Sequence, residues 1–231
     1  MRPQVLTSLT LTNDANGIFQ DQTTSGAATL TLNGALVESG IAYCYGAASD
    51  RNIHQAQLIA IEGSGNNSGV VATILGTGPG SEVTGEDLTL SNAGTATSAK
   101  YYKTITSIVV GGAVTGNIEG GWLSGSTDPA VLLACKCDYT QAPMNQSLRG
   151  VISSGASLTW SAQYTMDMPQ DDYGTVGFDN SAAWSDVDGM AATATTDQGN
   201  TAFPVTAVRL EINSYSSGTI KFTAIQGHSG Y

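Results

Sequence analysis

Apolar and polar residues alternate along most of this chain with the period of two that is typical of β-strands. Successive side chains of a strand point to opposite faces of its sheet, so alternation makes one face apolar. The run "QAQLIAIEG" (55–63) shows the pattern and stops at the turn-forming "GSGNNSG". Such runs predict strands in the first half of the chain at 29–37, 55–63, 69–78, 87–94, 103–112 and 115–121.

A second series of alternating runs predicts strands at 130–139, 157–166, 202–214 and 218–227. Strands that recur roughly every ten residues, separated by turns, are typical of sandwiches and barrels. One stretch, "YCYGAASDRNIHQAQ" (43–57), is compatible with a helix, and we assign it to a loop.

The two series meet at "GGWLSGSTDPAV" (120–131), which is rich in Gly and Ser and has few large apolar residues. We place a domain boundary here and predict an N-terminal β-domain, 1–122, and a C-terminal β-sandwich domain, 123–231. The second contains a long loop, 167–201, and loops of that length usually carry contacts or hold local structure. The predicted fold is all-β, with two tandem β-sandwich-like domains of jelly-roll or immunoglobulin-like type.

Two local features of the first half lead to sharper predictions. Asn33-Gly34 follows an alternating run, which is a strong signal for a two-residue hairpin turn. In "KYYKTITSIVVGG" (100–112), alternation makes the two tyrosines point in opposite directions, so they cannot form one stacking platform. It places Tyr101, Lys103, Ile105, Ser107 and Val109 on one face, and Tyr102, Thr104, Thr106, Ile108 and Val110 on the other.

Composition excludes several kinds of partner. Lys and Arg total 8 against 19 Asp and Glu, which gives a net charge of −11. Phosphate binding depends on clustered Lys and Arg, so we expect no nucleic-acid and no membrane-surface partner. No apolar run approaches the roughly 18 residues of a spanning helix. The N-terminal "MRPQVLTSLTLTND" alternates instead of forming a signal-peptide core, so we expect synthesis in a cytoplasm.

The candidates for catalysis are weak. Cys44, Cys135 and Cys137 are an odd, small set that suits reduced and buried thiols, and their spacing is not that of a zinc or redox motif. A nucleophile pair of Cys44 with His54 lacks a flanking motif and an acidic residue to orient the histidine. We expect His228 to be solvated. The residues around Ser124 lack the pattern of a serine hydrolase, and we predict that the protein is not an enzyme and binds no cofactor.

The acidic part of the long loop is the best candidate for a metal site. Its aspartates include the "SDVDG" pair, but the spacing of a calcium loop is not satisfied, and turn chemistry explains Asp and Gly equally well. A carboxylate pair for glycoside hydrolysis is a distant alternative. The candidate ligands are Asp179, Asp186 and Asp188, with Asp171 and Asp172 nearby in the sequence.

Aromatic residues of the second half provide another hypothesis, a platform for sugars. Trp160 and Tyr164 lie four apart on one expected strand and so share a face, but core packing is the commoner fate of such a pair. The remaining members of this group are Tyr173, Phe178 and Trp184. For subunit contacts, we choose as interface candidates Tyr101, Tyr102, Tyr173 and Trp184.

Several runs, taken in order, resemble structural proteins of tailed bacteriophages. In the first half these are "TLTLNGALVESGIA", "NNSGVVATILGTGPG" and "TLSNAGTATSAKYYKTITSIVVGGAVTGNIEGGW". In the second half they are "LTWSAQYTMDMP", "FPVTAVRL" and "GTIKFTAIQG". Tyr102 stands where the phage pattern usually has Phe, and "NIEGG" replaces its usual Val-Gly ending.

The resemblance implies a non-enzymatic virion component of the head-decoration, collar, neck or tail-associated kind. Its expected partners are other phage structural proteins of the capsid, portal, neck or tail, together with copies of itself, and a trimer is the expected soluble unit. Its expected location is the virion, after synthesis in the host cytoplasm. A tail-tube or tail-tip protein is one alternative, and a carbohydrate-binding or adhesion module is another.

Overall fold

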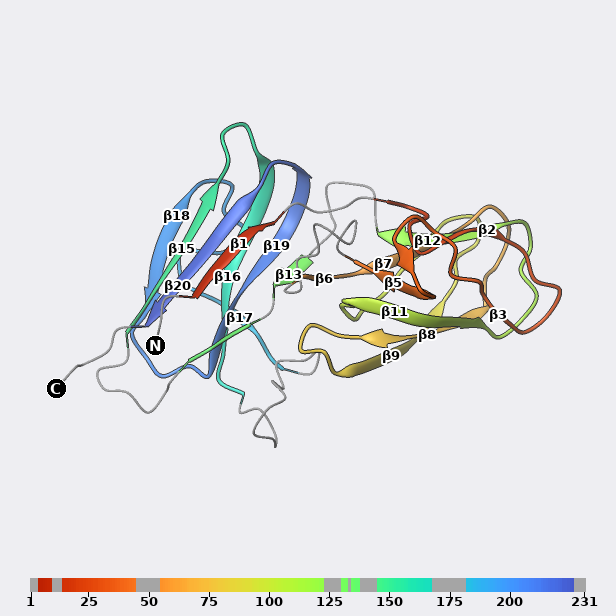
Figure 1. Cartoon of the computed structure of the whole chain (residues 1–231), viewed down its shortest axis with the longest axis horizontal. Helices are drawn as coiled ribbons and strands as arrows, with labels where there is room; N and C mark the ends of the chain where they lie inside the picture. Colours follow the sequence, from red (N-terminus) through yellow and green to blue (C-terminus); the bar gives the residue numbers. More distant parts are fainter. Residues whose placement is uncertain are drawn as a thin grey trace.

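The computed structural model describes residues 4–9, 14–44, 55–122, 130–132, 134–137, 145–167 and 182–226. In this part of the chain the elements are the strands β1 to β20, without a helix, and their pairings are antiparallel (Figure 1). The predicted all-β class is therefore confirmed. The strands form four sheets, which we name A to D.

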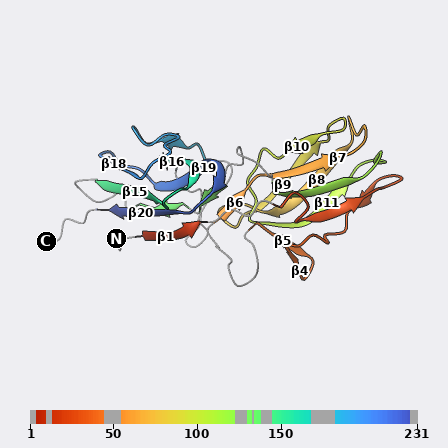
Figure 2. The same ribbon diagram turned by 90° about the horizontal axis from the view of Figure 1, so that it is seen from above.

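Sheets A and D lie at one end of the molecule and pack against each other as two layers (Figures 1 and 2). Sheet A has the order β1 (Gln4–Leu9), β20 (Ile220–Gln226), β15 (Gln146–Ile152), β18 (Asp197–Thr201). Sheet D has the order β17 (Ser185–Asp186), β16 (Ser157–Thr165), β19 (Ala207–Ser217), β13 (Ala130–Leu132), β6 (Gln55–Gln57), and β14 (Cys135–Lys136) also pairs with β19.

The space between sheets A and D is filled by a hydrophobic core, cluster 1. Trp160 of β16 and Phe222 of β20 are both fully buried and meet edge to face, with ring centroids 6.4 Å apart. Gly150 of β15 lies directly over the Trp160 ring, where a Cβ atom would be only 2.3 Å from it. The indole is therefore enclosed by strands from both sheets, which is the interior packing that a two-layer arrangement requires.

Sheets B and C lie at the other end of the molecule (Figure 1). Sheet B has the order β10 (Thr95–Thr97), β7 (Ile59–Gly63), β12 (Ile118–Trp122), β2 (Phe19–Gln22). Sheet C has the order β4 (Val37–Glu38), β5 (Ile41–Tyr43), β11 (Thr104–Val110), β8 (Val71–Thr77), β9 (Val83–Thr89), and β3 (Ala28–Thr29) also pairs with β11.

Sheets B and C enclose a second core, cluster 2, which is separate from cluster 1. Its largest fully buried side chains are Trp122, Tyr102 and Phe19. Trp122 ends β12, Phe19 begins β2, and Tyr102 lies two residues before β11. Regular alternation of buried and more exposed positions is seen in β8, which contributes Ala72 and Ile74 to this core.

Two strands cross the predicted boundary between 1–122 and 123–231. β1 pairs with β20 in sheet A, so residues 4–9 lie with the strands of the second half of the chain. β6 pairs with β13 in sheet D, and its Gln57 also exchanges both backbone hydrogen bonds with Tyr102. Backbone hydrogen bonds therefore connect the two ends of the molecule, a long-range pairing that local composition does not reveal.

The hairpin predicted at Asn33-Gly34 is wrong. Gly34 instead packs on Gly17, where a Cβ would lie 2.2 Å from the Gly17 backbone, and its N–H donates to Ile18. The two-residue turn is six residues later, at Ser39-Gly40 between β4 and β5, where φ is 54° and 80°. Positive φ at both central residues is the geometry of a type I′ hairpin turn.

The uninterrupted alternation predicted for 101–110 is also wrong. The pairing of β11 with β8 shifts register between Ile105 and Ser107, which is a β-bulge at Thr106. As a result Ile105 and Ile108, three residues apart, are both fully buried in cluster 2. The prediction placed them on opposite faces because a bulge changes the phase of a strand without changing its composition.

The strand predicted at 29–37 is wrong, because only its two ends belong to strands, β3 and β4. The run 55–63 is divided between β6 of sheet D and β7 of sheet B, and the run 130–139 between β13 and β14.

The other predicted strands are found with shifted ends, and several strands were not predicted. The missed strands include β15 and β18, which form half of sheet A. The predicted loop 167–201 contains β17 and β18, although its residues 168–181 lie outside the described residues. The helix-compatible stretch 43–57 falls largely at 45–54, also outside them.

Candidate functional site

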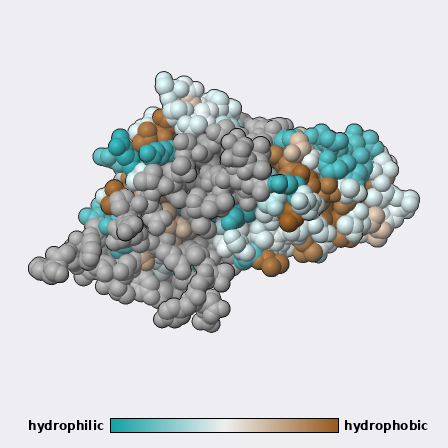
Figure 3. Space-filling model, viewed as in Figure 1, coloured by the Kyte–Doolittle hydropathy of each residue, from teal (hydrophilic) through white to brown (hydrophobic). Residues whose placement is uncertain are grey.

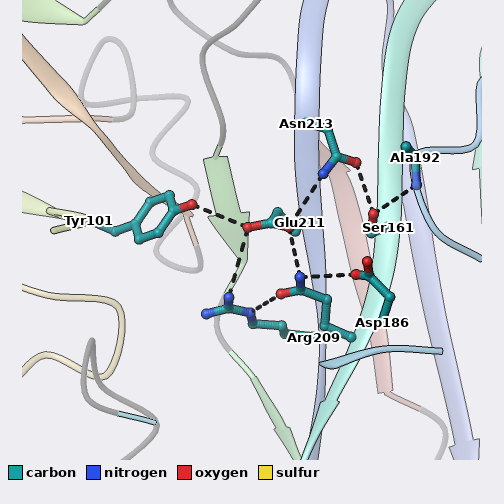
Figure 4. Close-up of polar contacts among 8 residues, drawn as sticks. Tyr101, Ser161, Asp186, Ala192, Arg209, Glu211 and Asn213 are labelled. Carbon is teal, nitrogen blue, oxygen red and sulfur yellow. Dashed lines mark hydrogen bonds and ion pairs between the residues drawn. The ribbon is translucent and has the colours of Figure 1, made fainter. Parts of the chain in front are cut away.

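The most connected group of polar side chains lies on one face of sheet D and is centred on Glu211 (Figure 4). The Glu211 carboxylate accepts hydrogen bonds from Gln163 Nε2 at 2.7 Å and from Asn213 Nδ2 at 3.4 Å. It also accepts one from Tyr101 Oη at 3.2 Å, and Tyr101 comes from the segment before β11, at the other end of the molecule. The Glu211 carboxylate therefore links a side chain near sheet C with side chains of sheet D.

A guanidinium group completes this Glu211 cluster. Arg209 is only 7% exposed, and its Nε donates to Gln163 Oε1 at 2.8 Å. Its Nη2 lies 3.9 Å from Glu211 Oε1, and its Cζ lies 4.2 Å from the centroid of the Trp184 ring. Gln163 also donates to Asp186 Oδ1 at 3.1 Å, so the buried cation and its acidic neighbours form one hydrogen-bonded network.

Burial shifts the pKa values of two members of the cluster. Burial lowers the pKa of Arg209 to about 10, and the charge of Glu211 opposes that change. Burial, followed by the charge of Glu211, raises the pKa of Tyr101 above its usual range. Near neutral pH Arg209 is therefore charged and the Tyr101 hydroxyl is a donor. The hydrogen bonds of Glu211 connect β16, β19 and the segment before β11.

The predicted interface residues lie in different environments. Tyr102 is fully buried in cluster 2, and Tyr101 contacts Glu211 of the same chain. Trp184 is partly buried against Ala134 and Ala207, with Arg209 over its ring. Tyr173 lies outside the described residues. The opposite directions predicted for the two tyrosines fit their positions, since one fills the core and the other contacts sheet D.

The aromatic platform is not assembled by the residues that the structure describes. Trp160 is fully buried, and its Nε1 donates to the Thr195 carbonyl at 3.0 Å. Tyr164 packs edge to face on Phe203, with ring centroids 5.1 Å apart. Both side chains thus serve packing, as the sequence favoured, while Phe178 lies outside the described residues.

The three cysteines are buried and reduced, as predicted. Burial raises the pKa of the Cys44 thiol above its usual range, which is the opposite of what an activated nucleophile needs. His54, Ser124 and His228 lie outside the described residues.

The two candidate metal ligands that the structure describes, Asp186 and Asp188, differ in their contacts. Asp186 accepts a hydrogen bond from Gln163, Asp188 is exposed, and Asp179 lies outside the described residues, as do Asp171 and Asp172. Within the described ranges, no group of three or more His, Cys, Asp or Glu side chains is arranged to hold a metal ion.

The Glu211 cluster was missed by the sequence reasoning. A signal was available, because "VRLEIN" places Arg209, Glu211 and Asn213 on one face of a strand whose other face is apolar. A charged face normally indicates solvent exposure. Only the tertiary structure shows that Tyr101 and Trp184 cover it.

The described part of the chain has no helix that is long and apolar enough to span a membrane. No protein-family model, no curated protein and no solved structure matches the chain.

Proposed function

We propose that this chain is a non-enzymatic structural component of a tailed-phage virion, which binds the capsid or the collar and neck through subunit contacts and stabilises or decorates the particle. The observation that carries the proposal is the placement of the phage-like runs. "KTITSIVV" forms β11, "NIEGGW" contains β12, and "GTIKFTAIQG" contains β20. The resemblance therefore falls on strands that build the two cores.

The fold behind this proposal is a pair of tandem β-sandwich-like units. Two separate cores support it, cluster 1 between sheets A and D and cluster 2 between sheets B and C. In this arrangement β1 and β6 extend from the first half of the chain into the second unit. That exchange would tie the units together and keep their spacing constant in an assembly.

Assembly would use surface burial and strand edges. β9 is the terminal strand of sheet C, and alternate residues of it direct their backbone groups to the sheet edge, where they can pair with another chain. One of these groups, the Gly85 carbonyl, already accepts a hydrogen bond from Lys100 Nζ at 2.6 Å. Hydrophobic side chains on the face shown in Figure 3 lie in small patches between hydrophilic and neutral ones. Weak contacts of this kind become strong when many copies bind a symmetric lattice. A tail-tube or tail-tip position is the alternative within the same class.

The proposal is tested on particles from cells that carry the genome encoding this chain. We expect the chain to co-sediment with purified particles at a fixed copy number per particle, measured by quantitative mass spectrometry. Cryo-EM density of those particles should accommodate sheets A to D, and its position separates head, neck and tail. A non-structural protein of the same lysate is the control.

A chain that stays with the soluble lysate, at the level of the non-structural control, would overturn the proposal. The proposal would also be overturned if the purified chain were strictly monomeric and did not bind to particles that lack it. Analytical ultracentrifugation of the purified chain measures its oligomeric state, and we expect a homo-oligomer.

A further inference from the structure

The outward face of sheet A contains a hollow of about 600 Å³, within the usual size range of small-ligand sites. It is formed by side chains of three adjacent strands, β15, β18 and β20, which are labelled in Figure 1. We call it the sheet A hollow. Its polar lining consists of Asn145, Ser147, Arg149, Gln198, Asn200 and Thr223.

The strand register explains why these residues meet. Ser147 pairs with Asn200 on one side and with Ile225 on the other. Arg149 pairs with Gln198 and Thr223, so the two rows lie next to each other on the same face. The short side chains of Ser147 and Thr223 leave room between their longer neighbours.

The polar lining is not used by the fold. In the part of the chain that the structure describes, the six polar side chains take part in no hydrogen bond, and Arg149 forms no ion pair. The backbone N–H and C=O groups of β15 are already hydrogen-bonded, because β15 is paired with a strand on each side. A ligand in the hollow would therefore be recognised mainly by side chains.

The charge of this face differs from that of the whole protein. Arg149 and Lys221 are two of only 8 Lys and Arg in a chain with 19 Asp and Glu. Lys221 pairs with Val151 and is a diagonal neighbour of Arg149 on the same face. The outward positions of β15, β18 and β20 carry no carboxylate, so the face attracts an anion in spite of the net negative charge.

We propose that the sheet A hollow binds a saccharide that carries a carboxylate, such as a hexuronic or sialic acid unit of a glycan. A guanidinium fork pairs with a carboxylate through two parallel hydrogen bonds, which assigns Arg149 to the acid group. Amide side chains both donate and accept, as sugar hydroxyls do, which assigns Asn145, Gln198 and Asn200 to the hydroxyls. This site lies on a different sheet from Trp160 and Tyr164, which belong to β16 of sheet D.

Two other ligand classes fit less well. Phosphate groups are usually held by several clustered cations or by backbone N–H groups, and the hollow has one guanidinium with one neighbouring lysine. An extended peptide is usually bound along a sheet edge through its backbone, whereas the hollow lies on a sheet face. A hydroxyl-rich anion matches the lining of the hollow, which combines amides, hydroxyls and the Arg149 guanidinium.

The test is binding of the purified chain to oligogalacturonate, sialyllactose and the neutral sugars maltotetraose and lactose, measured by calorimetry and by NMR shifts. We expect the acidic sugars to bind and the neutral sugars to bind at least ten times more weakly. Arg149→Gln should weaken acidic-sugar binding by about 10- to 100-fold, the usual contribution of a hydrogen bond to a charged group. Arg149→Lys should recover only part of it, because lysine lacks the fork.

A matched pair of amide variants provides the control. Gln198→Ala removes an amide from the hollow and should weaken binding, while Gln20→Ala removes an exposed amide from sheet B and should not change it. Circular dichroism and thermal unfolding verify that each variant is folded. Because the assay uses the isolated chain, its result is independent of the proposed virion location.

Three results would overturn the inference. One is the absence of binding to any acidic sugar at millimolar concentration. Another is equal binding of acidic and neutral sugars that is unaffected by Arg149→Gln. The third is stronger binding of inorganic phosphate or of an oligoglutamate peptide than of the acidic sugars.

Discussion

Glu211 is the residue whose contacts are most informative about this molecule. It is bonded to Gln163 and Asn213 of its own sheet and to Tyr101, which precedes a strand of sheet C. It also neutralises Arg209, a cation that is almost entirely buried. A buried cation that loses its counter-charge is costly, since the low-dielectric surroundings disfavour it.

Glu211→Gln keeps the shape of the side chain and removes the charge. We expect it to lower the free energy of unfolding by about 1–3 kcal/mol, measured in urea, because Arg209 loses its closest counter-charge. The control is Glu62→Gln, an exposed carboxylate directly opposite Glu119 in the β7–β12 pairing. Its removal should be neutral or slightly stabilising, because like charges then no longer face each other. Equal losses for both variants would contradict this account of Glu211.

At the scale of single elements, the decisive features are interruptions of regular strands. The bulge at Thr106 turns both Ile105 and Ile108 into cluster 2, and the Ser39-Gly40 turn sets the register of β4 on β5. The turn requires positive φ at Ser39, which serine adopts less readily than asparagine or glycine. The hairpin therefore has a turn residue that is not optimal for its geometry.

The strain at Ser39 predicts that two substitutions there change the stability in opposite directions. Ser39→Asn should raise the free energy of unfolding by a few tenths of a kcal/mol, and Ser39→Val should lower it by about 1–2 kcal/mol, because a β-branched residue strongly disfavours positive φ. Ser25→Val, at an exposed position without positive φ, is the matched control and should change stability by less than about 0.5 kcal/mol. Urea unfolding of the three variants measures these differences. A loss at Ser25 as large as that at Ser39 would refute the explanation.

At the scale of the whole molecule, both cores contain buried thiols, and the stability of the fold depends on their remaining protonated. Burial raises the pKa of Cys135 to about 12 and that of Cys137 to about 11, from ordinary values of 9.0, and moves that of Cys44 further still. In the unfolded chain the thiols ionise at lower pH than in the folded chain. The unfolded state then binds fewer protons, so stability is lost as pH rises above about 9.

The free energy of unfolding should therefore fall between pH 8.5 and 10.5, by up to about 1.4 kcal/mol per pH unit for each ionising thiol. Urea unfolding at a series of pH values measures the slope. A chain in which all three cysteines are replaced by alanine should show a shallower slope, whatever its stability at pH 7. An unchanged slope in that chain would show that other groups control alkaline stability.

The sequence predicted part of the strand content and little of how distant strands pair. β8, β16 and β20 lie inside predicted runs because each alternates regularly. β18 was missed because "DQGNT" contains no large apolar residue. It becomes a strand through its hydrogen bonds to β15, and the sheet A hollow depends on it. The hollow could thus not be predicted from local patterns.

By itself the sequence determined the all-β class, the burial of its cysteines and the opposite directions of Tyr101 and Tyr102, since these follow from alternation and composition. The tertiary structure alone decided that β1 joins β20, that Glu211 meets Tyr101, and that Arg149 stands among amides on one face of sheet A. The physical reason is the range of the interactions. Alternation is set by adjacent residues, whereas pairings between distant strands depend on how the whole chain buries its apolar surface.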